Sequence, residues 1–285
     1  MSGSGTVGRG RGAGAGAFGI AAETDDAPLP DLPLRRYPRV RVAAAGGLNA
    51  ATREAVVVSG PLSHRDAPGV FVHRVRPRVE ETLASLVPER IPAAEVPAGF
   101  RPASVLIPLY PHAGEVRVLL TRRTHALPTH AGEISFPGGR REPGEGARSA
   151  ALREAREEVG LDPGLVSVLG EMDEVWSVGG YLVRPFVGWL DERPLIRPDA
   201  GEIAAVLEPS LRELMDPVVH RVERMEARGR AYPVHFFDWE GQVIWGLTGG
   251  LLYRLILLLR GEVPAEPMNH LEALRTFRAH RGGGG

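Results

Sequence analysis

The hydrophobic pattern of the chain predicts regular structure mainly between residues 98 and 262. Residues 103–109 form a mainly apolar run, and residues 115–121 alternate between apolar and polar positions before becoming mainly apolar. We interpret these runs as two strands joined by a hairpin turn at residues 111–114. Further predicted elements are strands at 165–170 and 181–190, a short strand or turn at 202–207, and a hairpin of 234–237 with 242–245 around a turn at 238–241.

Two helices are predicted within the same region. Between the turn residues Pro143-Gly144 and the stop signal Asp162-Pro163, Ala151, Ala155 and Val159 recur every four residues and define one apolar helix face. Residues 247–259 are almost entirely apolar but too few to span a bilayer, which needs about 20 residues, so we expect a buried helix. Strands on both sides of one helix, followed by a second helix, predict an α/β fold with a mixed sheet between helices.

The remaining segments have weaker patterns. Residues 1–35 are rich in Gly, Ala, Pro and Asp and are predicted to be a disordered tail, and residues 263–285, which end in four glycines, are predicted to be a C-terminal tail. Residues 36–97 are an N-terminal extension with apolar runs at 56–58 and 70–72 that suggest short strands, and with a modest helical pattern at 78–87. This extension either packs on the main domain at 98–262 or is poorly ordered.

Composition excludes several classes of function. The chain of 285 residues has a formal net charge of −1, so no basic field indicates a specific nucleic acid or an anionic membrane as its partner. It has no cysteine, which excludes disulfides, thiolate catalysis and cysteine-ligated zinc. Neither a signal peptide nor a membrane span is predicted, and we therefore expect a cytoplasmic protein.

The candidate chemistry lies on the helix that precedes Asp162. Glu154, Glu157 and Glu158 are three or four residues apart, which places their Cβ atoms about 5–6 Å apart on one helix face. Their mutual repulsion is removed by a hard divalent cation, since Mg²⁺ prefers oxygen ligands. For the helix alone, a solvated surface rich in Glu and Arg is an equal alternative, in which Arg153 and Glu157 form an i,i+4 pair.

The residues before this helix favour the metal site. Gly139 is followed by Glu145 after five residues, and then by Arg153-Glu154, Glu157-Glu158 and Gly160-Leu161 at the spacing G-x5-E-x7-R-E-U-x-E-E-x-G-U. This spacing resembles the signature of the Nudix hydrolase superfamily, with Ala155 and Leu161 at its apolar positions. The resemblance implies a Nudix-type α/β/α sandwich with a mixed β-sheet, and metal-dependent hydrolysis of the pyrophosphate of a nucleoside diphosphate derivative.

The flanking sequence resembles one branch of that superfamily, the coenzyme A pyrophosphatases. The matching segments are 119–124 (LLTRRT), His130-x-Gly132, 136–139 (FPGG), 180–188, Glu202-Ile203 and 245–248. The resemblance implies that coenzyme A or its thioesters are cleaved to 3′,5′-ADP and 4′-phosphopantetheine. Pro128 stands where the branch has an arginine, a residue suited to bidentate phosphate recognition, and Thr124 stands where it has a serine. Either Arg122, Arg123 or His130 binds the coenzyme A phosphates instead, or the preferred substrate differs.

The resemblance also implies roles for individual residues. Mg²⁺ or Mn²⁺ is expected as the cofactor, and Glu154, Glu157 or Glu202 is expected to act as the catalytic base. The expected metal ligands are Glu154, Glu158, Glu157 and the Gly139 carbonyl, with Glu145 binding a second ion or orienting the motif; the expected substrate-binding residues are Arg122, Arg123, Thr124 and His130.

Three further questions stay open at this point. A Nudix enzyme for ADP-ribose, a dinucleotide or a nucleoside triphosphate is one alternative function. A non-catalytic Nudix-fold regulatory module is another, which the presence of every glutamate of the motif disfavours. The expected partner is a small-molecule nucleotide. The sequence does not decide whether the protein forms a homodimer, in which Trp245 would pack at the dimer interface rather than in the core.

Overall fold

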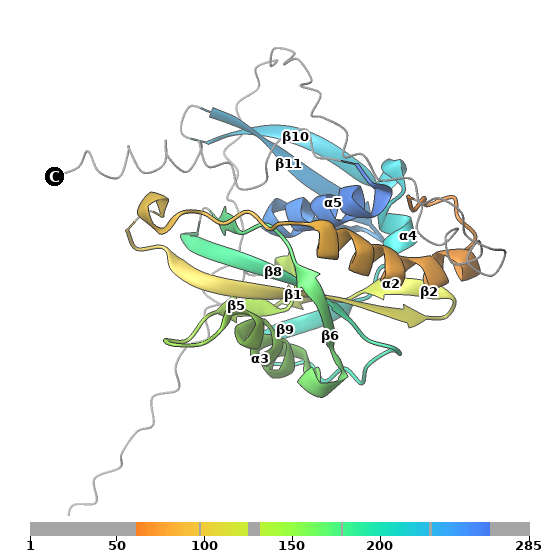
Figure 1. Ribbon diagram of the computed structural model, residues 1–285, viewed down its shortest axis with the longest axis horizontal. Helices are drawn as coiled ribbons and strands as arrows, with labels where there is room; N and C mark the ends of the chain where they lie inside the picture. The colour runs from red at the N-terminus through yellow and green to blue at the C-terminus, as the bar shows by residue number, and fades with distance from the viewer. Residues whose placement is uncertain (1–60, 97, 125–131, 178, 228–229, 263–285) are drawn as a thin grey trace, which may run out of the picture.

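The computed structural model describes residues 61–262 except 97, 125–131, 178 and 228–229 (Figure 1). Its centre is a six-stranded sheet in the order β2-β1-β8-β6, in which β5 pairs with β1 and β7 pairs with β8. The strands are β1 (Arg101–His112), β2 (Glu115–Val118), β5 (Gly138–Arg140), β6 (Ser167–Glu171), β7 (Val175–Ser177) and β8 (Tyr181–Trp189). Because β1 and β8 run parallel while the other pairs are antiparallel, the sheet is mixed, as predicted.

Helices cover both faces of this sheet. The helices α2 (Pro68–Ser85) and α5 (Gly246–Arg260) lie on one face, and α3 (Ala147–Val159) lies on the other (Figure 1). Successive side chains of β1 point to opposite faces, so Ile107 joins the core beneath α2 and α5 while Leu106 joins the core beneath α3. All residues from Ala103 to Tyr110 are therefore buried, which explains why this stretch of the sequence is mainly apolar.

Two smaller sheets complete the fold. The first, in the order β4-β3-β9, contains β3 (Leu120–Arg123), β4 (Ile134–Ser135) and β9 (Ile203–Leu207). The second contains β10 (His220–Ala227), β11 (Arg230–Trp239) and β12 (Gln242–Ile244). The strand β10 was not predicted, because its sequence HRVERMEA is mostly polar and lacks a regular alternation. Short helical segments are η2 (Ala93–Glu95), η3 (Pro163–Leu165), α4 (Leu211–Leu214) and η4 (Pro217–Val219).

Local turn chemistry explains both predicted hairpins. The β1–β2 turn places Ala113 and Gly114 at φ angles of 51° and 78°, and the β11–β12 turn places Glu240 and Gly241 at 47° and 73°. Positive φ at both central positions is typical of the type I′ turn, whose twist matches that of the flanking strands. The structure thus confirms both hairpins, and at the start of α4 Ser210 and Glu213 form a capping box.

The N-terminal extension contributes a helix to the core. The strand prediction for residues 70–72 was wrong, because these residues lie in α2, where Phe71, Val75, Val79 and Leu83 repeat every four residues on one buried face. Three adjacent apolar residues suggested a strand locally, but the longer repeat decides the structure. From residue 61 the extension packs on the sheet, one of the two options that the sequence left open. The strand predicted at 56–58 and both predicted tails lie outside the described residues.

Two buried carboxylates attach residues 89–91 to the sheet. Asp173 accepts a hydrogen bond from the Glu89 N–H at 2.9 Å, and Glu174 accepts one from the Ile91 N–H at 3.1 Å. Asp173 is also paired with Arg254 of α5 at 2.8 Å, and Glu174 with Arg184 of β8 at 2.9 Å. These carboxylates therefore have structural roles. Within the described residues, no helix is both long enough and apolar enough to cross a membrane.

Gly138 is expected to be essential for the stability of the sheet. A Cβ atom at this position would lie 2.5 Å from the Ser104 carbonyl oxygen and 2.6 Å from the Val105 Cα, so the backbone of β1 would have to move. We expect Gly138→Ala to lower the free energy of unfolding by roughly 3 kcal/mol, measured by urea denaturation. Gly69 of α2 has open space around it, so Gly69→Ala is the control and should leave stability unchanged or raise it. Equal effects of the two substitutions would contradict this account.

Candidate active site

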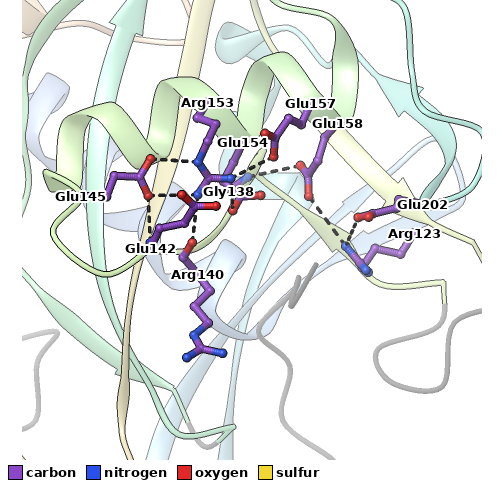
Figure 2. Close-up of polar contacts among 10 residues, drawn as sticks. All are labelled: Arg123, Gly138, Arg140, Glu142, Glu145, Arg153, Glu154, Glu157, Glu158 and Glu202. Carbon is purple, nitrogen blue, oxygen red and sulfur yellow. Dashed lines mark hydrogen bonds and ion pairs between the residues drawn. The ribbon is translucent and has the colours of Figure 1, made fainter. Parts of the chain in front are cut away.

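The candidate site lies where α3 crosses the end of β5. The loop of residues 141–146 connects these elements, and α3 ends at Gly160, whose φ of 71° suits a left-handed helix cap. The apolar face of α3, including Ala151, Ala155 and Val159, packs against the sheet as predicted. Its packing sets the glutamates of the next helical turns beside the backbone of Gly138 and Gly139, which come from β5 (Figure 2).

Arg153 joins three of these carboxylates. Its guanidinium lies 2.8 Å from Glu145 Oε1 and 2.9 Å from both Glu154 Oε1 and Glu157 Oε2, and it donates to the Arg140 carbonyl oxygen at 3.0 Å (Figure 2). The hydrogen bond from Arg153 is the main reason why the pKa of Glu145 is lowered. Arg153 therefore fixes the loop onto the helix and neutralises part of the carboxylate charge.

Glu154 lies against Gly139. A Cβ atom at position 139 would lie 2.6 Å from the Glu154 carboxyl carbon, so any other residue there would displace this carboxylate from its present position. Burial raises the pKa of Glu154 to about 7, although the neighbouring Arg153 acts in the opposite direction. A partly desolvated carboxylate of this kind gains from a nearby cation.

Glu158 is the most enclosed member of the cluster, with 5% of its surface exposed. It accepts a hydrogen bond from the Gly138 N–H at 3.2 Å, and its Oε1 lies 3.7 Å from Arg123 Nη1. Burial, together with the charge of Glu154, raises the pKa of Glu158 to about 8. The structure thus places two carboxylates with raised pKa values four residues apart on α3.

Strand pairing brings Glu202 to the same place. Arg123 at the end of β3 pairs with Ile203 at the start of β9, and Arg123 Nη1 lies 3.8 Å from Glu202 Oε2 (Figure 2). Arg123 is 3% exposed, so its guanidinium is enclosed between Glu158 and Glu202. The sequence predicted a substrate-binding role for Arg123, whereas its contacts in the structure are with carboxylates of the site.

The residues present fit a hard divalent cation by their donor chemistry. Glu154 and Glu158 supply carboxylate oxygens, the ligands that Mg²⁺ and Mn²⁺ prefer, and Gly139 leaves the space that Glu154 occupies. Across the described part of the chain, however, no three His, Asp or Glu side chains are grouped as a metal site. Arg153 and Arg123 instead engage these carboxylates in ion pairs. Glu154 and Glu158 are thus the residues best placed to hold a cation.

The other predicted site residues differ in their exposure and in their contacts. Glu157 is at the rim, with 58% of its side chain exposed, and both Glu145 oxygens are engaged, by Arg153 and by the Glu142 N–H. Arg122 turns away and donates to Gln242 Oε1 on β12 at 3.2 Å. Thr124 contacts the Gly201 carbonyl oxygen, and His130 lies outside the described residues.

Sequence reasoning missed two features of the site. It paired Arg153 with Glu157 only, because the contact with Glu145 depends on how the loop of residues 141–146 folds back onto α3. It also did not anticipate the Gly138 N–H as a donor to Glu158. One sequence signal could have predicted that Arg123 faces inward. It lies two residues after Thr121 on the same strand, where side chains two apart share a face, and both side chains are buried.

Comparison with known proteins identifies the family. The family model described as NUDIX domain matches residues 100–233. The uncharacterized Nudix hydrolase NudL of Photorhabdus laumondii is 36% identical over 156 residues, which cover 54% of this chain and 83% of that protein. The chain belongs to the Nudix hydrolase family. Family membership confirms the resemblance seen in the sequence, and the helices on both faces of a mixed sheet confirm the predicted Nudix fold.

Two further relatives extend the comparison. Nudix hydrolase 15, a mitochondrial protein of Arabidopsis thaliana, is 36% identical over 184 residues, covering 61% of this Nudix chain and 65% of the relative. The chain thus spans somewhat less than two thirds of that relative's length. The peroxisomal coenzyme A diphosphatase NUDT7 of Mus musculus is 33% identical over 169 residues, covering 57% of this chain and 72% of the relative.

Proposed function

We propose that this Nudix protein is a metal-dependent pyrophosphohydrolase acting on a nucleoside diphosphate derivative. The observation that carries the proposal is the pair of enclosed carboxylates, Glu154 and Glu158, held on α3 beside the Gly138-Gly139 backbone. Burial raises the pKa of both Glu154 and Glu158, and the charge of Glu154 raises that of Glu158 further, so their ionised forms are unfavourable for folding. Their presence is explained by a cation, Mg²⁺ or Mn²⁺, that they bind for catalysis.

The protein residues have separate tasks in this reaction. When bound, the cation neutralises charge on the phosphate oxygens and lowers the pKa of water. Arg153 keeps Glu154 in position by joining it to Glu145 and Glu157. Glu157 and Glu202 have 58% and 35% of their side chains exposed, so water can reach both carboxylates. Each is therefore able to act as the general base for the attacking water. The choice among the predicted bases stays open.

We further propose coenzyme A or its thioesters as the substrates, cleaved to 3′,5′-ADP and 4′-phosphopantetheine. The support is the LLTRRT and FPGG segments upstream of the helix, together with the similarity to the mouse coenzyme A diphosphatase. The absence of an arginine at Pro128 weighs against this choice, and Arg122 and Arg123 are both engaged by protein groups. ADP-ribose, a dinucleotide and a nucleoside triphosphate are therefore the competing substrates.

A substrate panel tests this proposal. We expect the full chain with Mg²⁺ or Mn²⁺ to hydrolyse coenzyme A with a kcat/KM at least about tenfold above that for ADP-ribose, a dinucleotide or a nucleoside triphosphate, equivalent to about 1.4 kcal/mol of discrimination. Chromatography of the products should show 3′,5′-ADP. The Glu158→Gln chain, purified in the same way, controls for contaminating phosphatases. A higher kcat/KM for any other substrate would overturn the choice of coenzyme A, and no hydrolysis of any substrate would overturn the enzymatic function.

A further inference from the structure

Arg123 has an unusual environment for a residue of a substrate-binding motif. Only 3% of its surface is exposed, and its Nη1 lies between Glu158 Oε1 at 3.7 Å and Glu202 Oε2 at 3.8 Å (Figure 2). Among the described residues, its Nε is buried and has no hydrogen-bond partner. The backbone around it is fixed, because the Arg123 N–H donates to the Glu133 carbonyl oxygen at 3.0 Å and Thr124 N–H donates to the Glu202 carbonyl oxygen at 2.9 Å.

We propose that Arg123 is a positioning residue that sets the affinity of the site for its divalent cation, by pairing with Glu158 and Glu202 in competition with that cation. The proposal rests on the proposed function, since it takes Glu158 to be a metal ligand. It assigns to Arg123 a role toward the metal, which neither the sequence pattern nor the relatives indicate.

Charge balance supports this role. Glu158 Oε1 and Glu202 Oε2 lie 3.7 Å and 3.8 Å from Arg123 Nη1, so one guanidinium balances two carboxylates on the side of Glu158 that faces β9. Arg153 serves the opposite side, where it pairs with Glu154, Glu145 and Glu157. A divalent cation that binds Glu158 must therefore share this carboxylate with Arg123, or displace it.

The geometry of these ion pairs makes displacement feasible. Both Arg123 distances exceed the 2.7–3.2 Å range of a direct N–H···O hydrogen bond. Arg153, in contrast, contacts its carboxylates at 2.8–2.9 Å. The contacts of Arg123 are thus the looser of the two sets, although its side chain is the more buried. A buried guanidinium at this distance still attracts the carboxylates electrostatically. Because it forms no short hydrogen bond to them, a divalent cation that displaces it breaks weaker contacts.

The experiment measures binding of Mn²⁺ alone to the full chain after removal of metal with a chelator and dialysis. Calorimetry gives the affinity, and the electron paramagnetic resonance signal of unbound Mn²⁺ gives an independent value. We expect Arg123→Met to bind Mn²⁺ about tenfold more tightly than the wild type, because an opposite charge at this distance changes the proton affinity of a carboxylate by about that factor or more. Unchanged or weaker binding by Arg123→Met would overturn the proposal.

A second variant decides the matter if Arg123→Met does not fold. Lysine keeps the charge but cannot hold two carboxylates with a planar fork, so Arg123→Lys should bind Mn²⁺ more tightly than the wild type, by less than Arg123→Met. Equal or weaker binding would contradict the competition. The control is Arg254→Met, which removes the ion pair of another buried arginine with Asp173 at 2.8 Å and should leave the Mn²⁺ affinity unchanged. A tenfold gain in that control would also overturn the assignment to Arg123.

Failure of this inference is distinguishable from failure of the proposed function. Glu158→Gln should lose Mn²⁺ binding if Glu158 is a ligand, whatever Arg123 does. If Glu158→Gln binds Mn²⁺ as tightly as the wild type does, Glu158 is not a metal ligand and the assignment of the metal site is wrong. If Glu158→Gln loses Mn²⁺ and Arg123→Met binds as the wild type does, the metal site stands and the role of Arg123 is refuted.

Discussion

Replacement of Glu158 by glutamine is expected to lower kcat by at least about 100-fold while making the folded protein more stable. Loss of groups that only support a metal ligand costs about 10–100-fold, so loss of the ligand itself should cost no less. Glutamine has the same shape and keeps an oxygen acceptor for the Gly138 N–H, so the packing of this buried position is retained. It removes a charge that is unfavourable in an enclosed environment with Glu154 nearby.

The gain in stability should depend on pH. Burial raises the pKa of Glu158 from its ordinary value of 4.5 to about 8, so between these values the folded chain binds more protons than the unfolded chain. Stability from this group is therefore lost as pH rises from about 4.5 to 8. We expect the difference in Tm between Glu158→Gln and the wild type, measured with a chelator present, to grow over this interval. A difference in Tm that does not change with pH would show that the folded structure does not raise the pKa of Glu158.

The control for this prediction is a second buried glutamate. Glu174 is 3% exposed and is engaged by Arg184 and by the Ile91 N–H. Glu174→Gln weakens those contacts, so it should lower Tm and leave kcat unchanged. The two substitutions, chemically identical and both in buried positions, should thus have opposite effects on stability, and only Glu158→Gln should lower kcat. If both lower Tm and spare kcat, Glu158 is structural and the proposed function is wrong.

Replacement of Arg153 by methionine is expected to lower kcat by roughly 10–100-fold and also to destabilise α3. This change removes the cation that joins Glu154 and Glu157 on the helix to Glu145 on the loop. The remaining glutamates then repel one another at three- and four-residue spacing. Lysine keeps the charge without the planar fork, so Arg153→Lys should recover more stability than turnover. Steady-state kinetics and thermal unfolding measure the two effects separately.

Arg156 is the matched control on the same helix. It is exposed and lies about one turn from Arg153, and the ion pairs described for the carboxylates of the site are made by Arg153 and Arg123. Arg156→Met should therefore leave kcat and Tm close to those of the wild type. A similar loss in both variants would mean that the general charge of α3 matters, and would contradict a specific role for Arg153.

Local patterns predicted the elements whose cause lies within a few residues. The hairpin turns were predictable because two adjacent residues, such as Ala113 and Gly114, adopt positive φ angles, and the capping box at Ser210 is equally local. The strand β10 was missed, since its pairing with β11 rather than its own sequence makes it a strand. Residues 70–72 were misassigned because a short apolar run does not distinguish a strand from one turn of a buried helix.

The sequence by itself determined the chemistry of α3. Glu154 and Glu158 share one face because helix geometry places residues four apart beside each other, and Gly139 precedes them at a spacing typical of the family. Only the tertiary structure decided what surrounds them. Arg123 and Arg122 are adjacent in sequence, yet one contacts Glu158 and Glu202 while the other contacts Gln242. The reason is that strand register and the pairing of distant strands set which face each side chain takes, and no local pattern contains that information.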